Sequence, residues 1–156
     1  MELTAVLLLP LFGAATLAVV GARRAAPELN AAFSLCTLIA AAALTARVIK
    51  QGPLLVWGGQ FFVDSFNVFL VALTAFVGFT TALFSRPYMR VERDHGRLTT
   101  RRMRLYHSMY QLFMATMLVA LLTNNMGVMW IALEGATLST VLLVSLYRTA
   151  ASLEAA

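Results

Sequence analysis

Apolar residues run along this chain in five long stretches, and short polar segments separate them. The stretches cover residues of about 3–21, 29–48, 63–84, 105–122 and 126–147. An α-helix needs roughly 20 apolar residues to cross the hydrocarbon layer of a membrane. The pattern therefore predicts an all-α, polytopic membrane protein with about five transmembrane helices, arranged as a single transmembrane domain over residues 1–156.

The segment between the second and third stretches does not follow a helical pattern. Gly52 and Pro53 open it, and two short apolar runs flank the pair Gly58 and Gly59. Short apolar runs around a Gly-Gly pair are typical of a hairpin, so we expect a small extramembrane hairpin near residues 51–62. Asp64 follows directly, in a position typical of a helix N-cap.

The composition agrees with a membrane protein and excludes several other classes. Apolar residues make up 60% of the chain and charged residues 12%, and the mean hydropathy is +0.80. These values exclude an ordinary soluble domain, a disordered tail and a small disulfide-stabilised secreted protein.

The net charge of +5 comes from one segment. Seven arginines and two acids lie between Arg86 and Arg104, and the rest of the chain is neutral. A basic run can contact nucleic acid or anionic lipid. Because apolar stretches flank this run on both sides, we interpret residues 86–104 as a cytoplasmic, arginine-rich loop and expect no nucleic-acid partner.

The distribution of Lys and Arg also predicts an orientation. The segments after the first, third and fifth stretches carry ten basic residues, including Arg23, Arg24 and Arg148, whereas the opposite side carries only Arg47 and Lys50. Basic residues concentrate on the cytoplasmic side of membrane proteins. We therefore expect the N-terminus outside and the C-terminus in the cytoplasm.

Residues for covalent, redox or metal chemistry are scarce. The single cysteine, Cys36, lies inside an apolar stretch, and the two histidines, His95 and His107, do not form a ligand pattern. Gly-rich phosphate loops, nucleophile elbows and paired carboxylates do not occur. We expect no catalytic residue, no cofactor and no metal site, so any oxidoreductase activity would belong to a complex that contains this chain.

Glu134 is the candidate functional residue. It lies about 12 Å along the fifth helix, near the middle of the membrane. A carboxylate there costs several kcal/mol unless it is paired, protonated or hydrated, and proton relays are a common use of such a group. The alternative is a protonated Glu134 that joins helices by hydrogen bonds, with Thr137 as a partner. Small residues from Ala132 to Thr140 predict close helix packing, which would hide Glu134 from lipid.

The fourth stretch adds a weaker polar stripe of His107, Tyr110 and Gln111, spaced as on one face of a helix. His107 and Tyr110 are interpreted as anchors at the membrane interface. Gln111 lies deeper and is a weak candidate for contact with a hydrated path.

Several segments together resemble a known family. The stretch from Asn124 to Val144 reads NNMGVMWIALEGATLSTVLLV, and YRT at 147–149, LEAA at 153–156, VDSF at 63–66, RLY at 104–106 and QLF at 111–113 agree with it. The chain resembles the proton-antiporter-like membrane subunits of complex I and of group 4 hydrogenases, in particular component F of hydrogenase-4. The resemblance covers the N-terminal five-helix portion of such a subunit.

The resemblance implies a larger helical membrane protein with an outward N-terminus. In the family, a glutamate of the fifth helix belongs to the proton channel, and Glu134 is similar to it in position and context. The partner lysines of the family lie in later helices and have no counterpart here. We therefore expect a truncated or split subunit, or a separate chain that supplies the later helices. The expected partners are other membrane subunits of a redox complex and the lipid bilayer of a bacterial inner membrane.

Two functions follow as hypotheses. In the first, the chain is a membrane-arm subunit of a complex like NADH:quinone oxidoreductase or like hydrogenase and formate hydrogenlyase. It then contributes to proton translocation through Glu134, with Thr137 and Gln111 as secondary candidates. In the alternative, it is a non-conducting structural or assembly subunit that packs against other membrane subunits.

Overall fold

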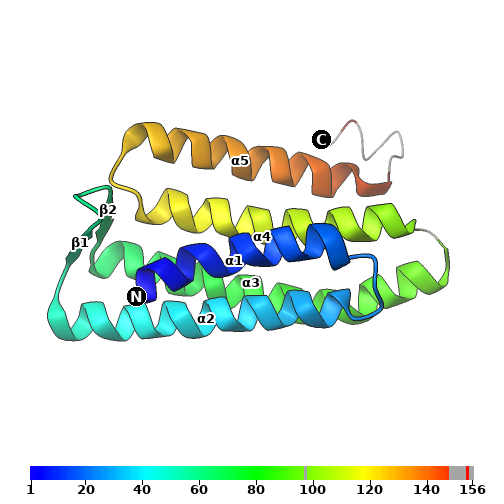
Figure 1. Ribbon diagram of the computed structural model, residues 1–156, viewed down its shortest axis with the longest axis horizontal. Coiled ribbons are helices and arrows are strands. Elements are labelled where there is room, and N and C mark those ends of the chain that lie inside the picture. The colour runs from blue at the N-terminus through cyan, green and yellow to red at the C-terminus, as the bar shows by residue number, and fades with distance from the viewer. Residues whose placement is uncertain (97, 148–153, 155–156) are drawn as a thin grey trace.

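The computed structural model describes residues 1–96, 98–147 and 154, and contains five long helices that lie side by side (Figure 1). In chain order the elements are α1 (Glu2–Val20), α2 (Ala26–Gln51), β1 (Leu54–Val56), β2 (Phe61–Val63), α3 (Ser65–Asp94), α4 (Thr100–Leu122), α5 (Met126–Val144) and a final 3₁₀ turn (Ser145–Tyr147). All five helices are long and apolar enough to cross a membrane. The predicted all-α class and the predicted number of helices are confirmed.

The segment expected as an arginine-rich loop is mostly helical. α3 continues through Arg86 and Arg90 to Asp94, and α4 begins at Thr100, so the expectation of a loop over all of 86–104 is wrong. Arginine favours the helix, and a charged side chain does not by itself end one. α3 ends at Asp94 with His95 as its C-cap, and the next residue, Gly96, turns the chain away with a φ of 68°.

The cytoplasmic location of this arginine segment stays a prediction. Two arginines that entered the charge count, Arg97 and Arg148, lie outside the described residues.

The predicted hairpin is present. β1 and β2 pair antiparallel, with Leu54 opposite Val63 and Val56 opposite Phe61. Gly58 and Gly59 turn the chain between them with φ values of 65° and 90°, which glycine adopts without steric cost. The hairpin also contacts the connection between α4 and α5, because the backbone N–H of Asn124 donates to the carbonyl of Gln60 at 2.7 Å.

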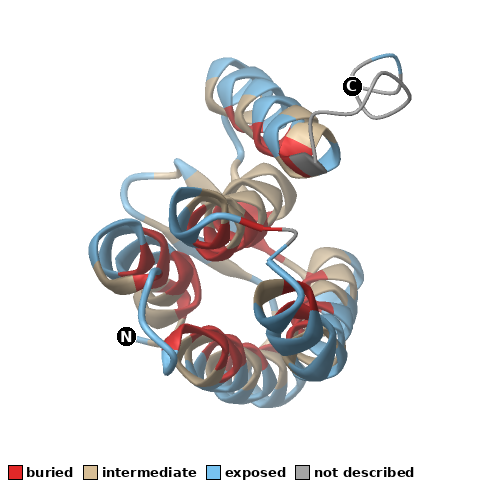
Figure 2. Cartoon of the chain, turned by 90° about the vertical axis from the view of Figure 1, so that its right-hand side faces the viewer, coloured by how far each residue is buried: buried red, intermediate tan, exposed pale blue. Residues whose placement is uncertain are grey.

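α4 is the central helix of the bundle. It contacts α1, α2, α3 and α5, whereas α5 packs mainly on α4. Viewed from the end in Figure 2, α5 stands at the edge of the bundle, and most of its outer surface is exposed. The principal core lies among the other four helices and is built from branched aliphatic side chains such as Val6, Leu44, Val71 and Leu118.

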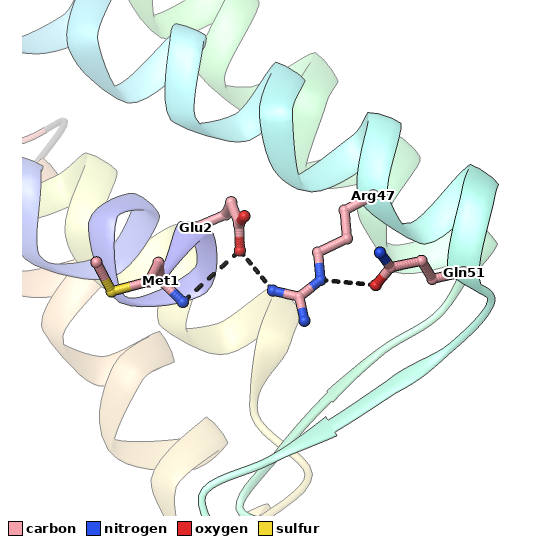
Figure 3. A network of polar contacts seen from close by, with 4 residues as sticks. All are labelled: Met1, Glu2, Arg47 and Gln51. Atoms are coloured by element: carbon pink, nitrogen blue, oxygen red, sulfur yellow. Dashed lines mark hydrogen bonds and ion pairs between the residues drawn. The ribbon is translucent and has the colours of Figure 1, made fainter.

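Ion pairs join α2 to its neighbours at both ends. Near the C-terminal end of α2, Nη1 of Arg47 lies 2.6 Å from Oε2 of Glu2 in α1. Nε of the same Arg47 donates to Oε1 of Gln51 at 3.1 Å (Figure 3). At the opposite end, Glu28 pairs with both Arg86 and Arg90 of α3. The arginine segment is thus partly occupied in holding α2 and α3 together.

The N-cap of α3 generates a test of the fold. The Asp64 carboxylate accepts hydrogen bonds from the backbone N–H groups of Phe66 and Asn67, and Oδ1 of Asn67 accepts from the N–H of Asp64. We expect Asp64→Ala to lower the free energy of unfolding by about 1 kcal/mol, because those N–H groups lose their acceptor. Circular dichroism during thermal unfolding in detergent measures the change.

Asp94→Ala is the matched control, since it removes a carboxylate from the opposite end of the same helix without removing a cap. Its expected effect is within about 0.5 kcal/mol. Equal losses in the two variants would contradict the role assigned to the cap.

Candidate functional site

Glu134 lies on the outer face of α5. Ala132, Ala136 and Ser139 are buried on the side of the helix that faces α4, and Glu134 is exposed on the opposite side. The expectation that small-residue packing hides Glu134 is therefore wrong within the described bundle. The small residues and the carboxylate occupy opposite faces of one helix. When the small residues pack against α4, the carboxylate therefore stays exposed.

The close packing itself is confirmed. A Cβ atom at Gly135 would lie 2.9 Å from Cγ2 of Thr116, so α5 approaches α4 closely at this point. Close backbone approach through small residues is a common way for membrane helices to associate.

The surroundings of Glu134 are apolar. The exposed face of α5 carries Trp130, Ile131, Leu133 and Leu138, each at least 46% exposed. Among the residues that the structure describes, none forms a hydrogen bond or ion pair with the Glu134 carboxylate. An ionised carboxylate in such surroundings requires a partner or water from outside this part of the chain.

Thr137, the predicted partner of Glu134, shares its exposed face, but no hydrogen bond between the two side chains occurs among the described residues. The Thr137 hydroxyl donates to the carbonyl of Leu133 at 3.0 Å, one turn back in the same helix. This bond satisfies the hydroxyl locally. Glu134 and Thr137 therefore lie on one surface of α5, and no described hydrogen bond links their side chains.

Gln111 is fully buried, on the other side of α4. Its Nε2 group donates to the carbonyl of Asn30 at 3.1 Å, to Oδ1 of Asn30 at 2.9 Å and to Oγ of Ser34 at 2.9 Å. These bonds join the middle of α4 to α2. The structure does not bring Gln111 and Glu134 together, because one is inside the bundle and the other faces outward.

His107 and Tyr110 are also buried, so their interpretation as anchors at the membrane interface does not fit the bundle. His107 is 1% exposed and lies one turn before Gln111 in α4. Tyr110 donates its hydroxyl proton to the carbonyl of Gly78 in α3. Both side chains contact other helices and do not lie on the outer surface of the bundle.

Asn30, Ser34 and Gln111 form what we term the α2–α4 polar cluster, and the buried His107 lies one turn before Gln111 in α4. Among the described residues, four buried side-chain atoms of this region have no hydrogen-bond partner: Nδ2 of Asn30, both ring nitrogens of His107 and Oε1 of Gln111. Buried polar atoms of this kind are usually satisfied by internal water. The cluster can therefore bind water.

Sequence reasoning missed Asn30 and Ser34. Their spacing of four residues, continued by Thr37, places three polar groups on one face of an apolar helix, and all three are buried. That pattern is a usable signal for an interhelical polar contact. The partner helix could not be inferred from it.

The described residues contain no group of three or more His, Cys, Asp or Glu side chains able to hold a metal ion. Cys36 is a free, exposed thiol on α2. Glu134 and His107 are the ionisable side chains within the helices that the sequence singled out for proton transfer or polar contacts.

Comparisons with known proteins support the resemblance seen in the sequence. No protein-family model matches the chain. It is 43% identical over 155 residues to a hydrogenase-4 component F homolog of Methylacidiphilum infernorum (isolate V4), covering 99% of this chain and 31% of that protein. It is 32% identical over 88 residues to NADH-quinone oxidoreductase subunit L of Buchnera aphidicola subsp. Baizongia pistaciae (strain Bp), covering 56% and 13% of the two chains.

The chain is therefore homologous to hydrogenase-4 component F and to complex I subunit L. It spans about a third of the length of the component F homolog and corresponds to an N-terminal part of these proteins. The predicted resemblance is confirmed.

The polar cluster generates a second test. We expect Gln111→Leu to lower the free energy of unfolding by about 1–3 kcal/mol, because the buried acceptors of Asn30 and Ser34 lose their donor. Unfolding in detergent, followed by circular dichroism, gives the measurement. Gln51→Leu, which removes an exposed hydrogen bond at the end of α2, is the control and should change stability by no more than about 0.5 kcal/mol. A Gln111→Leu effect as small as that of the control would show that the cluster contributes little.

Proposed function

We propose that this chain acts as an antiporter-like membrane subunit, or as part of one, in a complex of the complex I or hydrogenase-4 type. In this proposal Glu134 contributes to proton translocation. One observation carries the assignment: a carboxylate lies in the middle of a long apolar helix, in a chain 43% identical to a hydrogenase-4 component F homolog.

The exposed position of Glu134 supports a role that involves further helices. A carboxylate next to Trp130 and Leu138 is costly in hydrocarbon unless a cation, a proton or water compensates its charge. The component F homolog is about three times as long as this chain. We infer that further helices, in the same subunit or in a separate chain, cover α5 and bring a basic partner to Glu134.

The alternative is a structural role without ion conduction. It is favoured by one observation: within the described residues, no polar group links Glu134 on α5 to Gln111 in the α2–α4 polar cluster. Under this reading, α5 presents an apolar surface for assembly, and Glu134 forms an interhelical hydrogen bond in its protonated state.

We further propose that the chain spans a bacterial inner membrane several times, with the hairpin outside and the arginine end in the cytoplasm. The fold supports this arrangement, because the connections α1–α2 and α3–α4 lie at one end and the hairpin at the other (Figure 1). Arg23, Arg24 and Arg101 belong to the first end, whereas Arg47 and Lys50 lie near the second. Such an asymmetry is typical of a cytoplasmic side.

Glu134→Gln tests the translocation proposal. The amide keeps the size and hydrogen-bonding capacity of the side chain but cannot release or bind a proton at physiological pH. We expect loss of redox-driven proton translocation in membrane vesicles that contain the complex, while assembly, seen by native gel electrophoresis, is unchanged.

Asp94→Asn is the control for the loss of one carboxylate, because Asp94 is exposed at the end of α3. It should leave translocation unchanged. Wild-type translocation by Glu134→Gln, combined with dissociation of the complex when the chain is deleted, would favour the structural alternative. Measurements with and without Na⁺ show whether the transported ion is H⁺ or Na⁺.

Single cysteines test the orientation. The background variant is Cys36→Ser, which removes the native thiol of the chain. In cells with a permeabilised outer membrane and an intact inner membrane, we expect Gln51→Cys to react with a membrane-impermeant maleimide. Asp94→Cys should react only after the inner membrane is opened, because its end of the bundle faces the cytoplasm. The opposite labelling pattern would contradict the proposed orientation.

A further inference from the structure

We propose that a cleft at the arginine end of the bundle binds the headgroup of an anionic phospholipid. The cleft has a volume of about 600 Å³ and lies among the ends of α1, α4 and α5. The residues that line it include Arg101, Arg102, Arg104, Ser108, Met109 and Leu142. The inference goes beyond the proposed function and does not depend on Glu134.

No described carboxylate neutralises the arginines of this cleft. Arg101, Arg102 and Arg104 line it, and within the part of the chain that the structure describes no carboxylate lies at ion-pair distance from any of them. Arg86 and Arg90 differ, because both pair with Glu28. Three free guanidinium groups around one cleft form a binding site for phosphate, for which arginine is well suited.

Two further features direct hydrogen-bond donors to the same place. The cleft lies at the start of α4, where the N-cap Thr99 accepts a hydrogen bond from the N–H of Arg102 and the N–H groups of the first turn carry partial positive charge. Ser108 also lines the cleft. It is only 6% exposed, and its hydroxyl forms no hydrogen bond within the described residues. An anion in the cleft would satisfy these donors.

The remaining walls are apolar and favour a lipid over a free phosphate. Leu105, Met109 and Leu142 continue the cleft from the arginines along the apolar sides of α4 and α5. A phospholipid matches both parts, because it joins a phosphate diester to hydrocarbon chains. The arginines lie at the end of the helices, where the headgroup layer of a spanned membrane would be, and basic pockets between membrane helices on the cytoplasmic side bind anionic headgroups.

Binding can be measured by native mass spectrometry on the full chain, purified and delipidated in a neutral detergent. Dioleoyl phosphatidylglycerol is titrated against dioleoyl phosphatidylcholine, which has the same acyl chains but no net charge. We expect wild type to retain phosphatidylglycerol preferentially. Arg101→Gln with Arg104→Gln should weaken its retention about 25-fold, since each arginine near an anionic lipid contributes roughly fivefold.

Arg23→Gln with Arg24→Gln is the matched control. It removes the same charge from the same end of the bundle, but neither residue lines the cleft. We expect retention within about twofold of wild type. An equal loss in both double variants would overturn the proposal, because retention would then depend only on net charge.

Leu142→Trp provides a second variant that keeps every arginine. A larger side chain on the apolar wall should reduce phosphatidylglycerol retention, and unchanged retention would overturn the placement of the acyl chains. Inorganic phosphate serves as a competitor. If it displaces phosphatidylglycerol at equal concentration, the cleft binds free phosphate and the lipid assignment is wrong.

Discussion

The structure of this chain depends on one constraint: in hydrocarbon, every backbone N–H and C=O group must have a hydrogen-bond partner within the protein. Five long helices meet most of that requirement, since only Pro10 in α1 and Pro87 in α3 lack an N–H group within a helix interior. Backbone groups outside regular helices are confined to the two ends of the bundle, in the hairpin and in the interhelical connections. There, side chains such as Asp64 and Asn125 cap the helices by accepting hydrogen bonds from their first N–H groups.

Interhelical polar contacts then decide how the helices are placed. Hydrogen bonds of Gln111 connect α4 to α2, and the hydrogen bond of Tyr110 connects α4 to α3. Ion pairs of Glu28 with Arg86 and Arg90 connect α2 to α3. α4 takes part in most of these contacts and lies at the centre. α5 receives none of them and is held by close packing through Gly135, so its outer face, with Glu134, remains open to partners.

Much of the fold could be predicted from the sequence, because each element has a local cause. The length of the apolar stretches predicted five helices, and the Gly-Gly pair predicted the hairpin. The arginine segment was predicted less well, since charge marks a residue as polar but does not end a helix. The candidate site was predicted only in part. The position of Glu134 in the middle of α5 followed from counting along a helix, whereas the burial of His107 and the contacts of Asn30 depended on which helices are neighbours.

The sequence by itself determined the class of the protein, the number and approximate positions of its helices, and the presence of a carboxylate in the middle of an apolar helix. These properties depend on residues close together in the chain. Only the tertiary structure decided that Glu134 faces outward, that Gln111 faces inward, and that three arginines converge on one cleft. The physical reason is that the side of a helix that becomes buried depends on which neighbours pack against it. In a chain this apolar, hydropathy alone does not distinguish one side from the other.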